Sequence, residues 1–141
     1  MIIVDASLAA KWVFWEAQSD AALSFWNNEA GNLGAPDLIA LEVAGAIVRR
    51  ANIDKSLRED MNEALVKWTR LLSGTSMQQF RLTTARTMNG AKIAISLGHP
   101  LKDCIYLVLA MELDCELVTC DAMFAAKAID VWPKVRMLEG A

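Results

Sequence analysis

Four carboxylic acids of this chain lie at the ends of apolar segments or inside them. They are Asp5, Glu42, Asp103 and Asp121. Asp5 follows the run IIV, Glu42 is the only charged residue within LIALEVAGAIV, and Asp121 follows LVTC. An ionised carboxylate buried without a partner loses much of its solvation free energy, so each acid needs a cation, a hydrogen-bond donor or water. These four residues are the first candidates for chemistry in the sequence.

Each acid also has a structural explanation when it is taken alone. Asp103 lies in the first turn of an expected helix, where the helix dipole favours an acid. Asp121 can cap the next helix, and Glu42 can point to solvent. Four carboxylates in one place repel each other, and such a cluster persists when a divalent cation neutralises it. Oxygen ligands without a His or Cys set suit Mg²⁺ or Mn²⁺ rather than zinc.

Histidine and cysteine offer little alternative chemistry in this sequence. His99 is the only histidine, and it precedes Pro100 in an expected loop. Because it lacks nearby partners for catalysis, we expect His99 to be a surface residue. The three cysteines are odd in number and form no CxxC pair, which predicts reduced core thiols rather than disulfides or a zinc site. They are Cys104, Cys115 and Cys120.

Short apolar runs alternate with helical patterns along the chain. We expect strands at 2–5, 33–35, 77–82, 115–120 and within 131–138. We expect helices at 7–14, 18–30, 38–50, 56–72, 84–97, 101–113 and 122–128. Ser56 and Glu59 match a capping box for the fourth helix, and Gly98 matches the end of the fifth. This alternation predicts βαβ units, with a mostly parallel sheet covered by helices on both faces.

The expected fold gives the acids a common place. In open parallel sheets, ligands bind beyond the carboxyl ends of the strands, where the strand order reverses. Asp5 and Asp121 each follow a predicted strand. The helix that carries Asp103 is too apolar for a surface helix, so we expect its first turn to open into the same cleft.

Composition narrows the class of protein. The chain has 141 residues, of which 55% are hydrophobic and 22% charged, so we expect a single folded domain over 1–141. No apolar run reaches the roughly 18 residues of a membrane span, and the N-terminus lacks the pattern of a signal peptide, which favours the cytoplasm. The net charge of −3 provides no strong basic field. Nucleic-acid binding would therefore need bound cations or a partner chain.

Four segments together resemble a known family. They are DAS at 5–7, APDLIALE ending at Glu42, LKDCIYLVLA with Asp103, and LVTCDAMF with Thr119 and Asp121. In this order and at this spacing they resemble a PIN domain, and the VapC-type toxins of bacterial type II toxin–antitoxin modules are the nearest match. The similarity extends over essentially the whole chain.

The resemblance implies a three-layer α/β/α fold with about five strands, and a metal-dependent endoribonuclease. It also implies a homodimer and an antitoxin encoded alongside. The family's acidic quartet corresponds to Asp5, Glu42, Asp103 and Asp121. Its hydroxyl positions correspond to Ser7 and Thr119. Cys120 stands where many relatives have Ala, and the following AMFAAK lacks a further charged ligand near the last acid, which leaves the number of metal ions open.

On this basis the expected reaction is hydrolysis of an RNA phosphodiester. Asp5, Asp103 and Asp121 would hold Mg²⁺, with Mn²⁺ as a substitute, directly or through its waters. Glu42 would bind metal or orient the attacking water. Ser7 and Thr119 would steady the carboxylates or a water rather than act as nucleophiles, since no base pairs with them.

Basic and aromatic side chains are the candidates for contacts with RNA and with an antitoxin. The candidates for RNA backbone contacts, which are otherwise ordinary solvated charges, are Lys11, Arg49, Arg50, Arg86 and Lys102. Aromatic residues gather near the N-terminus, where they predict core packing or an antitoxin groove assisted by the stripe at 57–68. They are Trp12, Phe14, Trp15, Phe25 and Trp26.

Two other classes of function compete with the nuclease. A noncatalytic PIN-fold protein could keep the fold and bind only a partner, although all four acids are present. A phosphate-handling signalling domain would also place Asp at strand ends. That class needs a second acid beside the first and a later Lys at a strand end, which IIVDAS and LVTCD do not provide.

Overall fold

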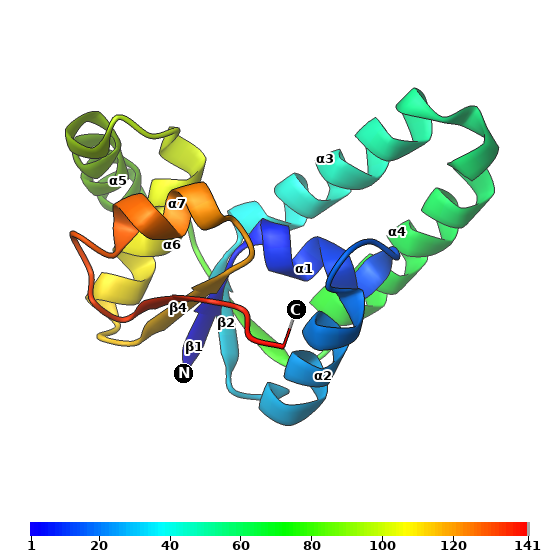
Figure 1. Ribbon diagram of the computed structural model, residues 1–141, viewed down its shortest axis with the longest axis horizontal. Helices are drawn as coiled ribbons and strands as arrows, with labels where there is room; N and C mark the ends of the chain where they lie inside the picture. Colours follow the sequence, from blue (N-terminus) through cyan, green and yellow to red (C-terminus); the bar gives the residue numbers. More distant parts are fainter. Residues whose placement is uncertain (141) are drawn as a thin grey trace.

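Residues 1–140 are described by a computed structural model, in which five short strands form one parallel sheet (Figure 1). The strands are β1 (Ile2–Val4), β2 (Leu33–Pro36), β3 (Met77–Phe80), β4 (Glu116–Thr119) and β5 (Val135–Met137). Their order across the sheet is β3-β2-β1-β4-β5, and every neighbouring pair is parallel. β1 lies in the centre and is buried throughout, which explains its uninterrupted apolar sequence.

Seven α-helices and one 3₁₀ turn connect these strands within residues 1–140. They are α1 (Ala6–Val13), α2 (Ser19–Glu29), α3 (Leu38–Ile53), the 3₁₀ turn η1 (Lys55–Leu57), α4 (Arg58–Ser73), α5 (Thr84–Leu97), α6 (Leu101–Glu112) and α7 (Ala122–Ala128). In Figure 1, α5 and α6 lie on one side of the sheet, whereas α1, α2 and α4 lie on the other. The predicted three-layer α/β/α arrangement with five strands is confirmed.

The strand order reverses between β1 and β4. The chain passes from β1 outward through β2 to β3, and later returns to the other side of β1 to add β4 and β5. Val4 pairs with Val118, so that Asp5 and Thr119 stand level at the carboxyl ends of adjacent strands. This is the switch point where open sheets of this kind bind ligands.

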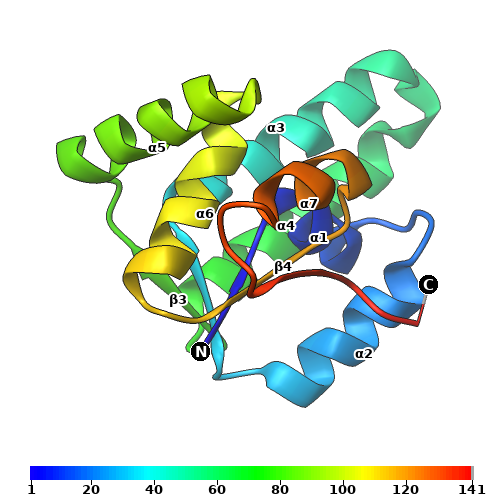
Figure 2. The same ribbon diagram turned by 60° about the vertical axis from the view of Figure 1, so that its left-hand side comes forward.

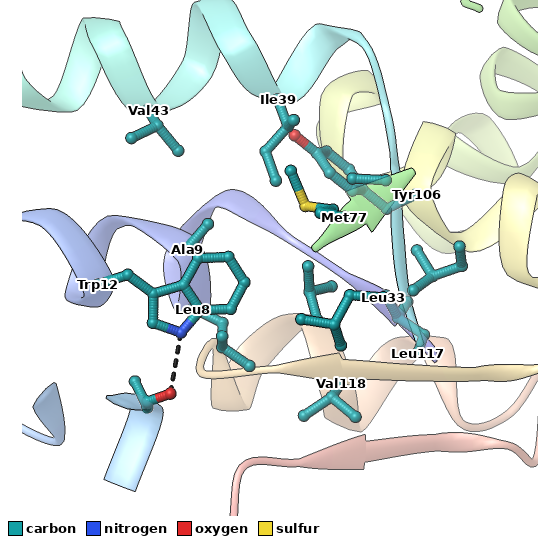
Figure 3. Packing of buried hydrophobic residues seen from close by; sticks show 14 of the residues in the cluster. Leu8, Ala9, Trp12, Leu33, Ile39, Val43, Met77, Tyr106, Leu117 and Val118 are labelled. Atoms are coloured by element: carbon teal, nitrogen blue, oxygen red, sulfur yellow. Dashed lines mark hydrogen bonds between the residues drawn. The ribbon is translucent and has the colours of Figure 1, made fainter. Parts of the chain in front are cut away.

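A single apolar core fills the space around the sheet (Figure 3). Trp12 is 8% exposed, donates its indole N–H to the Ala22 carbonyl at 2.9 Å, and packs edge-on against Trp26. Met61 and Trp68 of α4 are also buried. Core packing therefore explains Trp12, Met61 and Trp68. Phe14, Phe25 and Trp26 are half-buried and pack against this core, and the antitoxin groove stays a prediction.

Trp15 is the exception among these aromatic residues, because it is 65% exposed.

The predicted capping box at the start of the fourth helix is wrong. Ser56 donates both its backbone N–H and its hydroxyl to the Asp54 carboxylate, at 3.0 and 2.6 Å. This Asp54 cap opens the 3₁₀ turn η1, and α4 begins only at Arg58. Ser56 therefore pairs with Asp54, which precedes it, and not with Glu59, which follows it.

α3 and α4 form a hairpin that projects from the rest of the molecule, as Figure 1 and Figure 2 both show. The indole N–H of Trp68 on α4 donates to the Ala40 carbonyl on α3 at 3.1 Å, which ties the two helices together near the sheet. No single helix in residues 1–140 is long and apolar enough to cross a membrane, and α5 and α6 reach that length only as a pair bent by 114°.

Candidate active site

Asp5 lies where β1 ends and α1 begins. It is the N-cap of α1, and its carboxylate accepts a hydrogen bond from the backbone N–H of Leu8 at 3.2 Å. The side chain is almost fully buried, with the residue 3% exposed. Capping of α1 therefore accounts for only part of the surroundings of Asp5.

Two hydroxyl groups hold the Asp5 carboxylate, one from Ser7 of α1 and one from Thr119 of β4. Ser7 donates to Oδ1 at 2.7 Å, and Thr119 donates to Oδ2. The same hydroxyl oxygens accept the backbone N–H groups of Cys120 and Asp121, both at 3.0 Å. The end of β1 is thus joined to the end of β4 through side chains, and Ser7 and Thr119 both donate to the Asp5 carboxylate.

Burial sets the acidity of Asp5. Desolvation raises the pKa of its carboxyl to about 6, against the lowering effect of the hydrogen bonds from Ser7, Thr119 and the Leu8 N–H. The charge of Asp103 raises this pKa further. A buried carboxylate with a nearby second acid is electrostatically unfavourable without a cation.

Glu42 lies on α3 and is half-buried. The hydroxyl of Tyr106 on α6 donates to its Oε1 at 2.7 Å (Figure 3 shows this hydroxyl pointing toward α3). Burial raises the pKa of Glu42, and the Asp103 charge adds to that effect. Burial and the adjacent carboxylate raise the pKa of Tyr106, so that its hydroxyl stays protonated and serves as a fixed donor.

Asp103 lies in the first turn of α6, as expected, and has an unexpected partner. His99 Nε2 lies 2.6 Å from Asp103 Oδ2. The His99 side chain is only 5% exposed and its ring stacks on Phe124 of α7. The expectation that His99 is a surface residue is wrong, because the turn between α5 and α6 directs the imidazole inward.

Asp121 is the N-cap of α7, and its Oδ1 accepts the backbone N–H of Phe124 at 3.0 Å. The predicted capping role is confirmed. As with Asp5, the cap also fixes the carboxylate at the carboxyl end of a strand, one residue beyond Cys120.

All four acids line one cavity of about 630 Å³ beyond the sheet. Three of them, Glu42, Asp103 and Asp121, use one carboxylate oxygen in a protein hydrogen bond and keep the second without such a partner within residues 1–140. No group of three or more His, Cys, Asp or Glu side chains in the described part of the chain is arranged as a ready metal site. The acids share one cavity, and like-charge repulsion opposes their closer approach.

The oxygen atoms that line the cavity are of the type that a hard divalent cation binds. All four side chains offer carboxylate oxygen, and the Ser7 hydroxyl also lines the cavity beside Asp5. The free oxygens of the other three acids give such a cation available ligands. The thiol of Cys120 also lines the cavity, but burial raises its pKa to about 11, which disfavours a thiolate ligand.

Basic side chains at the cavity fall into two groups. Glu16, which also lines the cavity, accepts Lys11 at 2.9 Å and Arg50 at 3.3 Å. Arg49 and Lys102 line the cavity, are exposed, and form no salt bridge within residues 1–140. These two cations face the acids without being neutralised by a neighbour.

Arg86, the fifth basic candidate, lies elsewhere. It pairs with Glu112 of α6 at 2.7 Å and donates to the Arg81 carbonyl, and it does not line the cavity. The structure therefore gives Arg86 a role in joining α5 to α6.

Comparison with known families supports what this geometry suggests. A profile described as "PIN domain" matches residues 2–130, which is most of the chain. The chain belongs to the PIN domain family. Members of this family are generally nucleases. A search of curated proteins finds no match.

Solved structures share the fold of this PIN domain. One is the crystal structure of PAE2754 from Pyrobaculum aerophilum, with a TM-score of 0.74 and 21% identity over 98% of this chain and 89% of the other. A second is VapC20 of Mycobacterium tuberculosis, described as a sarcin–ricin loop cleaving toxin. Its TM-score is 0.74 at 14% identity, covering 89% of this chain and 94% of the other.

Three residues of this PIN-domain site were not predicted from the sequence. Tyr106 looked like one more core residue in an apolar helix, although its position three residues after Asp103 was a signal. His99 stands four residues before Asp103, a spacing that the intervening Pro100 obscured. Glu16 follows the apolar run WVFW, which was a signal, but only the fold brings it to Arg50.

Proposed function

We propose that this PIN domain is a metal-dependent endoribonuclease that hydrolyses RNA phosphodiesters, and that it is the toxin of a type II toxin–antitoxin module. The observation that carries the proposal is the convergence of four carboxylates from β1, α3, α6 and the β4–α7 turn on one cavity. Structural similarity to a protein described as a sarcin–ricin loop cleaving toxin supports RNA as the substrate class.

Asp5, Glu42, Asp103 and Asp121 would hold Mg²⁺, with Mn²⁺ as a substitute. When bound, such a cation supplies an activated water and stabilises charge that develops on the phosphate. Ser7 and Thr119 keep the Asp5 carboxylate in place by donating to both of its oxygens. Tyr106 fixes Glu42 in the same manner, so that its second oxygen can bind the cation or accept a proton from water.

Arg49 and Lys102 would contact the RNA backbone. They are the cavity-lining cations that lack a salt bridge within residues 1–140. Lys11 and Arg50 would instead hold Glu16 at the rim. The charges of Lys102 and Arg49 also lower the pKa of Glu42, so they favour its ionised form.

The toxin assignment carries further expectations about partners. A cognate antitoxin would cover the cavity or its rim, and two copies of the chain would form a homodimer. The RNA target would lie in the cytoplasm. A noncatalytic partner-binding protein is the alternative, and it would keep the fold while showing no metal-dependent cleavage.

The central test is cleavage of labelled single-stranded and hairpin RNA by the purified chain with Mg²⁺ or Mn²⁺. We expect cleavage that EDTA abolishes and that Asp5→Asn or Asp103→Asn reduces by at least about 100-fold, because each removes a charged ligand. Arg86→Gln is the matched control, since Arg86 lies away from the cavity. Cleavage that survives EDTA, or equal activity in the Asn variants, would refute the proposal.

A further inference from the structure

His99 is held more firmly than a loop residue usually is. The turn between α5 and α6 begins at Gly98, whose φ of 62° is in the left-handed region that glycine adopts readily. The His99 backbone N–H donates to the Ala94 carbonyl at 3.1 Å, and Lys127 of α7 donates to the Gly98 carbonyl at 3.0 Å. The backbone on both sides of the peptide bond is therefore fixed before the side chain makes any contact.

The imidazole contacts one of the four acids and stacks on a phenyl ring. Its Nε2 is 2.6 Å from Oδ2 of Asp103, and its ring stacks on Phe124 with centroids 5.0 Å apart and planes 23° apart. Phe124 is fully buried, and its backbone N–H donates to the Asp121 carboxylate that caps α7. One side chain thus contacts Asp103 directly and rests on the residue that orients Asp121.

The other ring nitrogen indicates which tautomer is present. Nδ1 of His99 is buried and has no hydrogen-bond partner within residues 1–140. A proton on Nδ1 would leave a buried N–H without an acceptor, which is unfavourable. The neutral tautomer with the proton on Nε2 leaves only a lone pair unsatisfied and lets Nε2–H donate to Asp103.

We propose that His99 is a positioning residue, which fixes the Asp103 carboxylate so that Oδ1 is presented to the cation. This inference rests on the proposed metal-dependent function. His99 occupies Oδ2, whereas Oδ1 has no hydrogen-bond partner in the described part of the chain, and Asp103 lines the cavity. Hydrogen-bond partners of metal-ligating carboxylates commonly change metal affinity by about 10- to 100-fold when they are removed.

A purely structural role does not explain the choice of histidine here. Phe124 offers the ring an apolar surface, so a phenyl ring would pack against it without burying an unpaired nitrogen. The backbone bonds of Gly98 and His99 would hold the turn with any side chain. What only a donor side chain supplies is the hydrogen bond to Asp103.

Mn²⁺ binding to the metal-free chain, measured by isothermal titration calorimetry, tests the proposal without relying on activity. His99→Phe keeps the stack and removes the donor, and His99→Gln returns an N–H at similar reach. We expect H99F to raise the Kd for Mn²⁺ by about 10-fold or more and H99Q to recover most of that loss. The unfolding temperature of metal-free H99F should stay close to that of the wild type.

Two further comparisons separate the possible outcomes. An H99F chain that is folded and binds Mn²⁺ as the wild type does, while Asp103→Asn does not, would overturn the role of His99 and leave the proposed function intact. A wild-type chain that binds no Mn²⁺ would overturn both. Should H99F not fold, His99→Asn replaces it, because its shorter amide cannot reach Asp103; equal Kd values for H99N and H99Q would then refute the proposal.

Discussion

Asp5 is the residue whose environment differs most from that of a free carboxylic acid. It is buried at the centre of the sheet's carboxyl edge, and it is held by donors from Ser7, Thr119 and the Leu8 backbone. Despite these donors, burial raises its pKa to about 6. An ionised Asp5 therefore lowers the stability of the metal-free chain, and a bound cation would offset this cost.

This environment predicts a pH dependence of stability in EDTA. The folded-state pKa of Asp5 lies above the unfolded value, so its contribution is fully present below about pH 3.8 and is lost as the pH rises to about 6. The rise of this pKa from 3.8 to about 6 corresponds to about 3 kcal/mol in the free energy of unfolding. Urea unfolding at pH 4, 6 and 8 measures this loss.

Asp5→Asn is the matched control, because it removes the titrating group and keeps a similar shape. The difference in unfolding free energy between wild type and D5N should change by about 2.5 kcal/mol from pH 4 to pH 8, with the wild type relatively weaker at pH 8. A difference that is constant across this range would show that Asp5 titrates normally in the folded chain.

The acids of the site were predictable because each stands out against apolar neighbours. Glu42 is the clearest case, since a lone acid in LIALEVAGAIV requires a reason. The groups that hold these acids were not predictable in the same way. Tyr106 and His99 act through contacts that depend on how α6 meets α3 and α7, and no local pattern records those contacts.

At the scale of elements, the close approach of α5 to α6 positions the turn that carries His99. Gly90 of α5 is buried against Ile105 of α6, and a Cβ at this glycine would lie 3.2 Å from Ile105 Cγ1. The two backbones are therefore nearer than most side chains would allow. Arg86 and Glu112 add an ion pair across the same two helices.

We expect Gly90→Val to destabilise the chain by about 1–3 kcal/mol, because its methyl groups would push α5 away from Ile105. Thermal or urea unfolding measures the effect. Ser96→Val, on an exposed position of α5, is the control for helix propensity and should change stability by less than about 0.5 kcal/mol. Equal effects of the two changes would mean that packing at Gly90 is not limiting.

Most elements could be predicted from local signals. The central strand β1 is a short apolar run, and Gly98 ends α5 with the left-handed conformation expected of it. The boundary of α4 was predicted wrongly, because Ser56 has an acid on either side, Asp54 and Glu59. It bonds to Asp54, whereas the prediction paired it with Glu59. Such competition between nearby caps depends on geometry that residue spacing alone does not contain.

At the scale of the whole molecule, the sign of the charge is the main obstacle to RNA binding. The net charge is −3, and the cavity itself contains four acids and Glu16. Attraction for a phosphate backbone must therefore come from a few well-placed cations. Arg49 and Lys102 meet this condition, whereas Lys11 and Arg50 are already paired.

Replacing Arg49 and Lys102 together by Gln should weaken RNA binding and reduce the slope of log K against log salt by about 0.7 for each phosphate that is no longer neutralised. Fluorescence anisotropy with single-stranded RNA, in the D5N background that leaves the RNA intact, measures this slope. The same measurement with Arg86→Gln should show no change, because Arg86 is occupied by Glu112. A slope unaffected by the double change would mean that neither residue binds the RNA backbone.

The overall class of fold could also be predicted, but not the order of the strands. Alternating strands and helices indicate a parallel sheet, and nothing in the composition of β4 reveals that it lies beside β1 rather than beside β3. That adjacency is what brings Thr119 to Asp5. The location of the site beyond the strand ends follows from a general rule, whereas its lining depends on this particular order.

The hydrogen bond between Thr119 and Asp5 joins positions 114 residues apart, and it has a consequence for biosynthesis. A ribosome delivers Asp5 long before Asp121, so the cavity cannot close while translation is still at α5. The edge of β1 that pairs with β4 stays unpaired until β4 has emerged from the ribosome. A growing chain therefore acquires its full set of acids only late in synthesis, when the segment through α7 has left the exit tunnel.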